Sequence, residues 1–274
     1  MSLKLRANLV LLGAGKMGGA MLEGWLRAGA DAKKIVALDP APPPEIKALI
    51  EKHAIRHNPP VVSIGETEVI LAAVKPQIME EVLPAVVPLK ASRPLILSIA
   101  AGKTIASFER HFGKDAAIIR SIPNTPAAIG RGITAMVANA NVSAAQQTLA
   151  AALLSSIGEV VTVEDEGLID VATAISGSGP AYVFYLAECL AEAGVKAGMP
   201  PELATQLARA TVAGAGELMR QTGLPAATLR QNVTSPKGTT YAALQVLMKD
   251  KDGLQALMTE AIAAAAKRSR ELAS

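Results

Sequence analysis

Short apolar runs alternate with segments of helical periodicity through the first 163 residues of the chain. Apolar runs that end at Gly, Pro or Asp are typical of buried parallel strands. Apolar residues that recur every three or four positions between these runs predict helices. The pattern predicts strands over 9–12, 35–38, 69–74, 94–99, 117–119, 133–137 and 160–163, and helices after Gly18, over 45–52, over 78–83 and from near Ser143.

Beyond residue 166 the pattern is helical throughout, because no strand candidate remains. Helices are predicted over 180–198, 201–221, 226–231, 239–249 and 253–271, and Asp252 is the predicted N-cap of the last one. Turn residues predict loops over 57–60, 120–126, 176–181 and 232–238. The chain therefore changes fold class near residue 164 without a low-complexity linker.

The first predicted strand runs directly into the spacing Gly13-x-Gly15-x-x-Gly18. Between a strand and a helix, this spacing is typical of dinucleotide binding. Gly13 is expected to permit the tight turn, Gly15 to let the backbone approach a pyrophosphate, and Gly18 to let the helix pack on the strand. The pyrophosphate would then bind the unpaired N–H groups at the helix start. The alternative is a glycine-rich turn that binds nothing.

Together these patterns predict an α/β protein with two domains. A Rossmann-type, doubly wound parallel sheet with right-handed crossovers is expected in a dinucleotide-binding domain over 1–163. An all-α domain is expected over 164–274. Its helices are rich in small residues and are expected to bury their faces against the first domain or against a second copy of the protein. We therefore expect a homodimer formed through the helical domain, with assembly into a higher homo-oligomer left open.

Asp39 ends the second predicted strand, 21 positions after Gly18 (39 − 18 = 21). An acid at this spacing is expected to bind the 2′-hydroxyl of an adenosine ribose. It would repel a 2′-phosphate unless a cation intervened. The alternative is a carboxylate that only caps the proline-rich turn at 40–44.

Composition excludes several classes of function. The net charge is only +3, with 27 basic and 24 acidic residues, which argues against a nucleic-acid partner. Three histidines and the single cysteine, Cys189, show no metal-ligand spacing, so no metal is expected. No apolar stretch is long enough to span a membrane. Lys4 and Arg6 precede an apolar run that Gly13 breaks, which indicates a strand rather than a signal peptide. A cytoplasmic protein is expected.

Six motifs occur in one order along the chain: GAGKMG at 13–18, AVKPQ at 73–77, SIAAG at 98–102, RSIPNTPA at 120–127, SGSGPAY at 176–182 and TSPKGTT at 234–240. Together they resemble pyrroline-5-carboxylate reductase, and the resemblance covers essentially the whole chain. It implies hydride transfer from NADPH or NADH to the C=N carbon of 1-pyrroline-5-carboxylate, which gives L-proline in the last step of proline biosynthesis.

The resemblance also implies a role for each motif. Residues 13–18 would hold the pyrophosphate, Asn58 would approach the adenosine end, and residues 73–76 with Ala100 and Ala101 would line the nicotinamide. The substrate carboxylate would bind Ser235 and the backbone N–H groups of residues 238–240, at an intertwined helical dimer interface. The cofactor-binding residues expected are Gly13, Ala14, Gly15, Lys16, Met17, Gly18, Asp39, Asn58, Ala73, Val74, Lys75, Pro76, Ala100, Ala101 and Asn124, and the substrate-binding residues are Ser235, Gly238, Thr239 and Thr240.

Thr240 is the one catalytic residue expected. A partly protonated imine accepts hydride readily, so the protein mainly has to hold the donor and acceptor carbons aligned. A threonine hydroxyl is a weak acid, and Thr240 is therefore expected first to orient the ring nitrogen. Lys237 stands where many relatives carry glycine, and it either attracts the carboxylate or, as we expect, points to solvent. Members of the family often prefer NADPH, whereas Asp39 predicts that NADH is accepted at least comparably.

Two other interpretations of the sequence remain open. One is a related two-domain imine or β-hydroxyacid reductase. Such dehydrogenases usually place a lysine on a glycine-rich helix of the second domain, and the segment 176–181 contains none. The other is a nucleotide-sensing dimer without catalysis. The loops 176–181 and 234–240 offer hydroxyls and free N–H groups that suit a small carboxylate, and the alternative for each loop is ordinary helix capping.

Overall fold

The computed structural model describes residues 3–273, which form two compact units. One unit contains residues 3–177 and 265–273, and the other contains residues 178–264. The units divide later in the chain than the domain boundary expected between residues 163 and 164. The reason is that helix α6 (Gly167–Ala172) packs on the last strands of the sheet. The expected boundary stays a prediction about independently folding domains.

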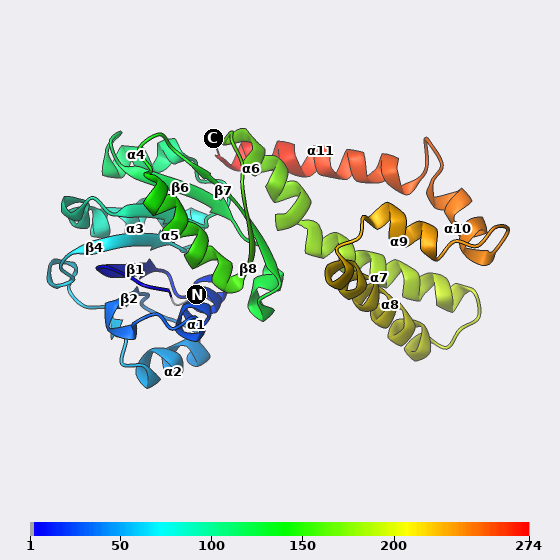
Figure 1. Ribbon diagram of the computed structural model, residues 1–274, viewed down its shortest axis with the longest axis horizontal. Helices are drawn as coiled ribbons and strands as arrows, with labels where there is room; N and C mark the ends of the chain where they lie inside the picture. The colour runs from blue at the N-terminus through cyan, green and yellow to red at the C-terminus, as the bar shows by residue number, and fades with distance from the viewer. Residues whose placement is uncertain (1–2, 274) are drawn as a thin grey trace. The chain divides into compact units, whose positions relative to one another are not determined.

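An eight-stranded sheet forms the centre of the first unit, in the order β3-β2-β1-β4-β5-β6-β7-β8 (Figure 1). The chain passes from β1 to β2 on one side and later returns to β4 on the other, so β1 and β4 flank the point where the strand order reverses. Ligands bind at the carboxyl ends of the strands at such a point. The strands are β1 (Asn8–Leu12), β2 (Ile35–Leu38), β3 (Arg56–His57), β4 (Thr67–Ala72), β5 (Leu95–Ser98), β6 (Ala117–Ile122), β7 (Gly132–Ala138) and β8 (Gly158–Thr162).

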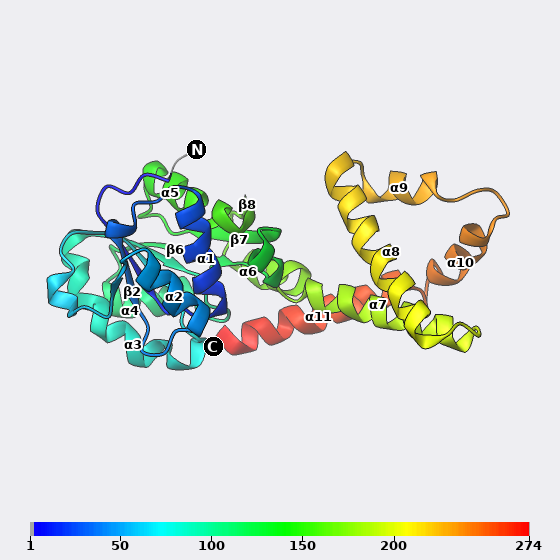
Figure 2. The ribbon, with the colours of Figure 1, turned by 90° about the horizontal axis from the view of Figure 1, so that it is seen from below.

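The central strands of the sheet are buried on both faces because they are apolar at nearly every position, whereas the edge strands β3 and β8 have no buried residue. Leu9 and Leu11 of β1 belong to one core, which includes Trp25. Val10 and Leu12 belong to the other. Figure 2 shows α1 and α2 on the same side of the sheet. Helices α1 (Lys16–Arg27), α2 (Pro44–Lys52) and α5 (Ala144–Leu154) cover the first face, and α3 (Met79–Val86) and α4 (Ile105–Phe112) cover the second.

The sheet is mostly parallel, as expected, and one pair of strands departs from this pattern. β6 and β7 pair antiparallel, whereas the other neighbouring strands are parallel. Only the short 3-10 segment η5 (Thr125–Ile129) separates β6 from β7. A parallel crossover needs about a dozen residues or more, so the chain turns straight back.

Three local expectations also need correction. The segment 57–60 was expected to be a loop, but His57 belongs to β3 and pairs with Ala37. The segment 120–126 was expected to be a polar loop, but β6 continues through Arg120 to Ile122. The segment 176–181 was expected to be a loop, but its start belongs to the π-helical turn η7 (Thr173–Gly177), which continues α6. In each case the polar residues predict a loop, but pairing with a neighbouring strand or packing on the rest of the fold gives regular structure.

The predicted helices of the second part are present. They are α7 (Gly179–Lys196), α8 (Pro201–Thr222), α9 (Ala226–Asn232), α10 (Thr239–Leu247) and α11 (Leu254–Ala273), the last of which ends in the first unit. Pro180 lies in the first turn of α7, as predicted. α11 begins at Leu254, so Gly253 rather than Asp252 directly precedes it. α7 and α8 pack through small residues: a Cβ added to Gly194 would lie 3.3 Å from the Cβ of Ala204.

Candidate active site

The glycine loop between β1 and α1 has the backbone geometry that the spacing predicts. Gly13 adopts φ +94° and donates its N–H to the carbonyl of Leu38 at 2.9 Å. A Cβ at Gly13 would lie 2.8 Å from the backbone nitrogen of Val74. A Cβ at Gly18 would overlap the carbonyl oxygen of Gly13. Only glycine therefore fits at either position, the first for the turn and the second for close packing of helix on strand.

Gly15 differs from its neighbours because it faces open space. A Cβ added there would meet no atom within 4 Å. Gly15 is also the N-cap of α1, which has no side-chain cap. The N–H groups of the first helical turn have no partner within the helix and can bind an anion. The open approach and these N–H groups fit a pyrophosphate.

Asp39 is bound to the glycine loop. Its Oδ2 accepts the N–H of Ala14 at 2.6 Å, and its Oδ1 accepts the N–H of Ala41 at 2.8 Å. The second contact caps the proline-rich turn at 40–44, which is the alternative role that the sequence allows for Asp39. A carboxylate has about four acceptor sites, so both contacts leave capacity for a ribose hydroxyl. The ribose contact itself stays a prediction.

Asn58 and His57 hold the backbone of Asp39. The side chain of Asn58 accepts the N–H of Asp39 at 2.9 Å and donates to its carbonyl at 2.8 Å. Nε2 of His57 lies 2.9 Å from the same carbonyl. Asn58 itself has φ +49°, a conformation that asparagine tolerates better than most residues. Its expected contact with adenosine stays a prediction, and its bonds to Asp39 are an additional role.

The two segments expected at the nicotinamide follow β4 and β5, which are adjacent strands. Ala73 donates its N–H to Leu12 at 2.8 Å, which places the start of 73–76 beside the end of β1. Ala100 is buried, and its N–H is bound to Oγ of Ser98 at 3.2 Å. Lys75 is exposed and precedes the 3-10 turn that Pro76 begins. Both segments therefore lie at the carboxyl edge of the sheet, beside the strand-order reversal.

Asn124 was expected to contact the cofactor, and its side chain is 8% exposed. Its Nδ2 donates to the carbonyl of Ser176 at 3.1 Å, and its Oδ1 accepts the N–H of Ile133 at 2.9 Å. Both ends of the amide are thus bound within the protein and join the π-helical turn to β7. Its cofactor contact stays a prediction.

The loop before α10 was expected to bind the substrate, and it has the form of a tight turn. Gly238 donates its N–H to the carbonyl of Ser235 at 3.1 Å, and Pro236 and Lys237 occupy the central positions. Lys237 has φ +60°, which a turn of type II requires at this position and which favours glycine. A Cβ at Gly238 would overlap Oγ of Ser235. The loop therefore brings a hydroxyl against the start of a helix.

Gly238 is the N-cap of α10, which has no side-chain cap. Because α10 begins at Thr239, the N–H groups of Thr239 and Thr240 have no partner within the helix. The positive end of the helix dipole adds to their attraction for an anion. Thr240 is half-buried in this first turn, and Ser235 is exposed. This set of donors suits a small carboxylate.

A partly exposed ion cluster joins the segments that follow β4 and β5. Glu80, in the first turn of α3, lies 3.1 Å from Nζ of Lys103, 3.7 Å from Arg110 and 2.8 Å from Nε2 of His111. Hydrogen bonds from His111 and then Lys103 hold the pKa of the Glu80 carboxyl below its usual value. The cluster ties the segment after β4 to the segment after β5.

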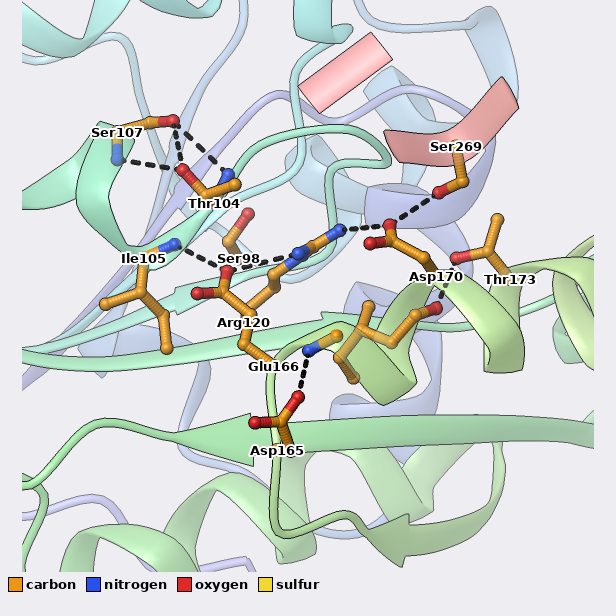
Figure 3. Close-up of polar contacts among 12 residues, drawn as sticks. Ser98, Thr104, Ile105, Ser107, Arg120, Asp165, Glu166, Asp170, Thr173 and Ser269 are labelled. Atoms are coloured by element: carbon orange, nitrogen blue, oxygen red, sulfur yellow. Dashed lines mark hydrogen bonds and ion pairs between the residues drawn. The ribbon is translucent and has the colours of Figure 1, made fainter. Parts of the chain in front are cut away.

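An ion cluster centres on the buried Arg120, which lies in β6 rather than in the expected loop, and Glu166 is its partly exposed member (Figure 3). Its guanidinium lies 3.1 Å from Glu166 and 3.2 Å from Asp170. Oγ of Ser269, on α11, donates to Asp170 at 2.7 Å. The i, i+4 spacing of the two acids was a visible signal in the sequence. Their pairing with a residue of β6 depends on the fold.

Among the described residues, no group of three or more His, Cys, Asp or Glu side chains is arranged to hold a metal ion. No helix in the described part of the chain is both long and apolar enough to cross a membrane.

Two family models match the chain in succession. Residues 8–102 match a model described as NADP oxidoreductase, coenzyme F420-dependent, and residues 166–272 match one described as pyrroline-5-carboxylate reductase dimerisation. The chain is 38% identical over 266 residues to the pyrroline-5-carboxylate reductase of Pseudomonas aeruginosa, covering 97% of each chain. It is 46% identical over 206 residues to that of Synechocystis, covering 75% of each.

The chain belongs to the pyrroline-5-carboxylate reductase family. Two solved structures of pyrroline-5-carboxylate reductases also superpose on this chain. The pyrroline-5-carboxylate reductase of Coxiella burnetii superposes with a TM-score of 0.90 at 32% identity, covering 98% of this chain and 100% of the other. The pyrroline carboxylate reductase of Plasmodium falciparum, solved with NADP bound, gives 0.80 at 29% identity, covering 98% and 99%. Membership of the pyrroline-5-carboxylate reductase family confirms the resemblance that the six motifs carry.

Proposed function

We propose that this chain reduces 1-pyrroline-5-carboxylate to L-proline with NADPH or NADH, as the last step of proline biosynthesis. Two features found in one chain carry the proposal. One is the glycine loop at the strand-order reversal, where Gly15 is open. The other is the start of α10, which follows Ser235 in the segment that matches the dimerisation model. A relative named pyrroline-5-carboxylate reductase matches 97% of the chain. The first feature suits a dinucleotide and the second a small carboxylate.

In the proposed complex, the coenzyme lies along the carboxyl edge of the sheet. Residues 13–18 bind the pyrophosphate through backbone N–H groups, and Asp39 with Asn58 binds the adenosine end. Residues 73–76 and the pair Ala100 and Ala101 form the surface against which the nicotinamide lies. The bound coenzyme supplies the hydride. The backbone fit supports this assignment, because Gly15 is open while Gly13 and Gly18 are tightly enclosed.

The substrate carboxylate binds Ser235 and the N–H groups of residues 238–240. This contact fixes one end of a planar ring, so that the C=N carbon can be held against the hydride donor. Reacting atoms must come within about 3–3.5 Å, and alignment accounts for much of the catalytic effect in such reactions. Thr240 orients the ring nitrogen through its hydroxyl. No acid–base dyad is required, because the imine meets the enzyme partly protonated.

We further propose that the protein acts as a cytoplasmic homodimer formed through its helical segment. Large apolar side chains are exposed along the described helices of the second unit, among them Phe184 and Tyr185 on α7 and Leu218 on α8. No residue of α7 is buried. An apolar surface of this kind marks a protein interface, and the family model that matches here is described as a dimerisation segment. The single cysteine fits a reducing compartment.

A spectrophotometric assay tests the proposed activity. Purified protein is mixed with NADH or NADPH, and 1-pyrroline-5-carboxylate is added. We expect substrate-dependent oxidation of the coenzyme and formation of proline in equal amount. Coenzyme binding without oxidation would favour a nucleotide-sensing dimer. Oxidation with a β-ketoacid or an unrelated cyclic imine, but not with this substrate, would favour the related reductase.

A further inference from the structure

The loop at residues 100–103 is held by contacts of Ala100, Gly102 and Lys103. Gly102 has φ +71°, and a Cβ there would lie 3.0 Å from the carbonyl oxygen of Leu272. The end of α11 therefore lies directly against the loop. Lys103 binds Glu80, and α4 begins at Ile105 immediately after the loop. The position of the loop thus depends on where α4 and α11 are anchored.

Glu166 anchors the start of α4. Its Oε1 accepts the N–H of Ile105 at 2.8 Å and a hydrogen bond from Nη1 of Arg120 at 3.1 Å (Figure 3). Thr104 and Ser107 form a capping box at the same helix end and satisfy other groups of the first turn. The carboxylate of Glu166 is therefore an additional restraint on the first residue of α4, two positions after the loop.

The same arginine anchors α11. Nη2 of Arg120 binds Oδ1 of Asp170, and this oxygen also accepts the hydroxyl of Ser269. The side chain of Arg120 is 3% exposed and that of Asp170 is 8% exposed. Two carboxylates face one guanidinium, and the positive N-terminal end of α4 offsets the excess negative charge. Removing Glu166 would leave Arg120 paired with Asp170, so the charge of the guanidinium stays compensated while the contact to the start of α4 is lost.

We propose that the cluster of Arg120, Glu166, Asp170 and Ser269 positions the loop at residues 100–103 for hydride transfer, with Glu166 as the positioning residue. In the proposed complex the cluster acts through the loop and not by contact with coenzyme or substrate. It fixes the helix that follows the loop through Glu166 and the helix end that abuts Gly102 through Asp170 and Ser269. The inference rests on the proposed function, because that function makes the loop part of the nicotinamide surface.

The test compares Glu166→Ala with Glu166→Gln and with a control at the amino ends of the strands, away from the carboxyl ends where the loop lies. Both contacts of Glu166 use one oxygen, which an amide retains, so Glu166→Gln is the conservative rescue. Asn139→Ala is the control. It removes bonds to Ile118 and Ala116 at the amino end of β6, far along the strand from the loop. Thermal unfolding shows that each variant is folded before it is compared.

Two readouts separate positioning from general destabilisation. The first is the dissociation constant of NADH measured beside that of ADP-ribose, which lacks the nicotinamide. We expect Glu166→Ala to weaken NADH binding about 5-fold to 10-fold and to leave ADP-ribose unchanged, because only the nicotinamide end meets the loop. The second is the deuterium isotope effect with NADH labelled at the transferred position. We expect it to rise, with kcat about 10-fold lower, because misalignment slows the hydride step.

Glu166→Gln and Asn139→Ala are expected to keep the NADH to ADP-ribose affinity ratio and the isotope effect of the wild type. The proposal is overturned if Glu166→Ala keeps them too, if it weakens both ligands equally, or if Glu166→Gln loses as much as Glu166→Ala. The binding comparison does not require turnover. An inactive wild-type protein would therefore refute the proposed function, while the ligand ratio would still decide the role of Glu166.

Discussion

Asn58 binds Asp39 through both backbone groups of the aspartate, accepting from its N–H and donating to its carbonyl. The carboxylate of Asp39 is thereby fixed in place, where it also accepts the N–H of Ala14 from the glycine loop. A fixed carboxylate cannot easily turn away from a neighbouring phosphate. This arrangement gives the coenzyme preference a structural basis that can be tested.

Asp39 is expected to make NADH at least as good a coenzyme as NADPH. Replacing Asp39 by Ser removes the negative charge, and we expect the ratio of kcat/KM for NADPH over NADH to rise about 10-fold, which corresponds to ~1.4 kcal/mol. Steady-state kinetics with both coenzymes measures the ratio. Asp39→Glu serves as the charge-preserving control. A strong preference of the wild type for NADPH would show that Asp39 does not set specificity.

The glycine loop offers a matched pair of substitutions. Gly15→Ala is expected to leave the unfolding temperature nearly unchanged and to weaken NADH binding, because its Cβ meets no protein atom but occupies the approach to the pyrophosphate. Gly18→Ala is expected to destabilise the protein by about 1–3 kcal/mol, because its Cβ would overlap the Gly13 carbonyl. Calorimetry and coenzyme titration separate the two effects. Unchanged NADH affinity in folded Gly15→Ala would contradict the pyrophosphate assignment.

Thr240→Ala is expected to lower kcat by about 10-fold through loss of substrate alignment. The stability of the protein should change by less than about 1 kcal/mol, since Thr240 is only half-buried. Thr240→Ser keeps the hydroxyl and should retain most of the activity. Kinetics of both variants, together with thermal unfolding, make the comparison. Wild-type turnover in Thr240→Ala would remove this residue from the mechanism.

Lys237→Gly is expected to stabilise the protein by about 1 kcal/mol, because Lys237 holds φ +60° and glycine adopts this conformation without cost from a Cβ. Lys237→Ala keeps the Cβ and should show no such gain. We expect KM for 1-pyrroline-5-carboxylate to stay unchanged, since the side chain is exposed. A KM that rises in both variants would show instead that the ammonium attracts the substrate carboxylate.

Glu80 is expected to contribute a small, pH-dependent stabilisation. Its folded-state pKa is lowered by His111 and Lys103. Its contribution is therefore present above the usual carboxyl pKa of 4.5 and is lost as the pH falls through the lower, folded-state value. The carboxylate of Glu80 is exposed, so Glu80→Gln should cost less than about 1 kcal/mol at pH 7. Unfolding temperatures measured from about pH 5 down to below the folded-state pKa should converge for the two proteins, and a difference that persists at the lowest pH would contradict this sign.

The sequence by itself determined the elements whose signals are local. The apolar runs identified the strands of the sheet other than β3, although β6 extends further than its run predicted. The glycine spacing identified the open start of α1, because the clearance around a backbone turn is set by adjacent residues. The turn at Pro236 and Lys237 and the helix after it were likewise predictable. The six motifs carried the family, which the relatives then confirmed.

Only the tertiary structure decided the features that join distant parts of the chain. Arg120 looked like a loop residue because it is charged, yet it lies buried in β6, paired with Glu166 and Asp170. The short two-residue strand β3 forms only because β2 offers it a partner. Ser269 reaches Asp170 across 99 positions of sequence. A charged side chain is stable in a core only where the fold places an opposite charge beside it. The residues next to Arg120 in the sequence do not show which distant acids will pair with it.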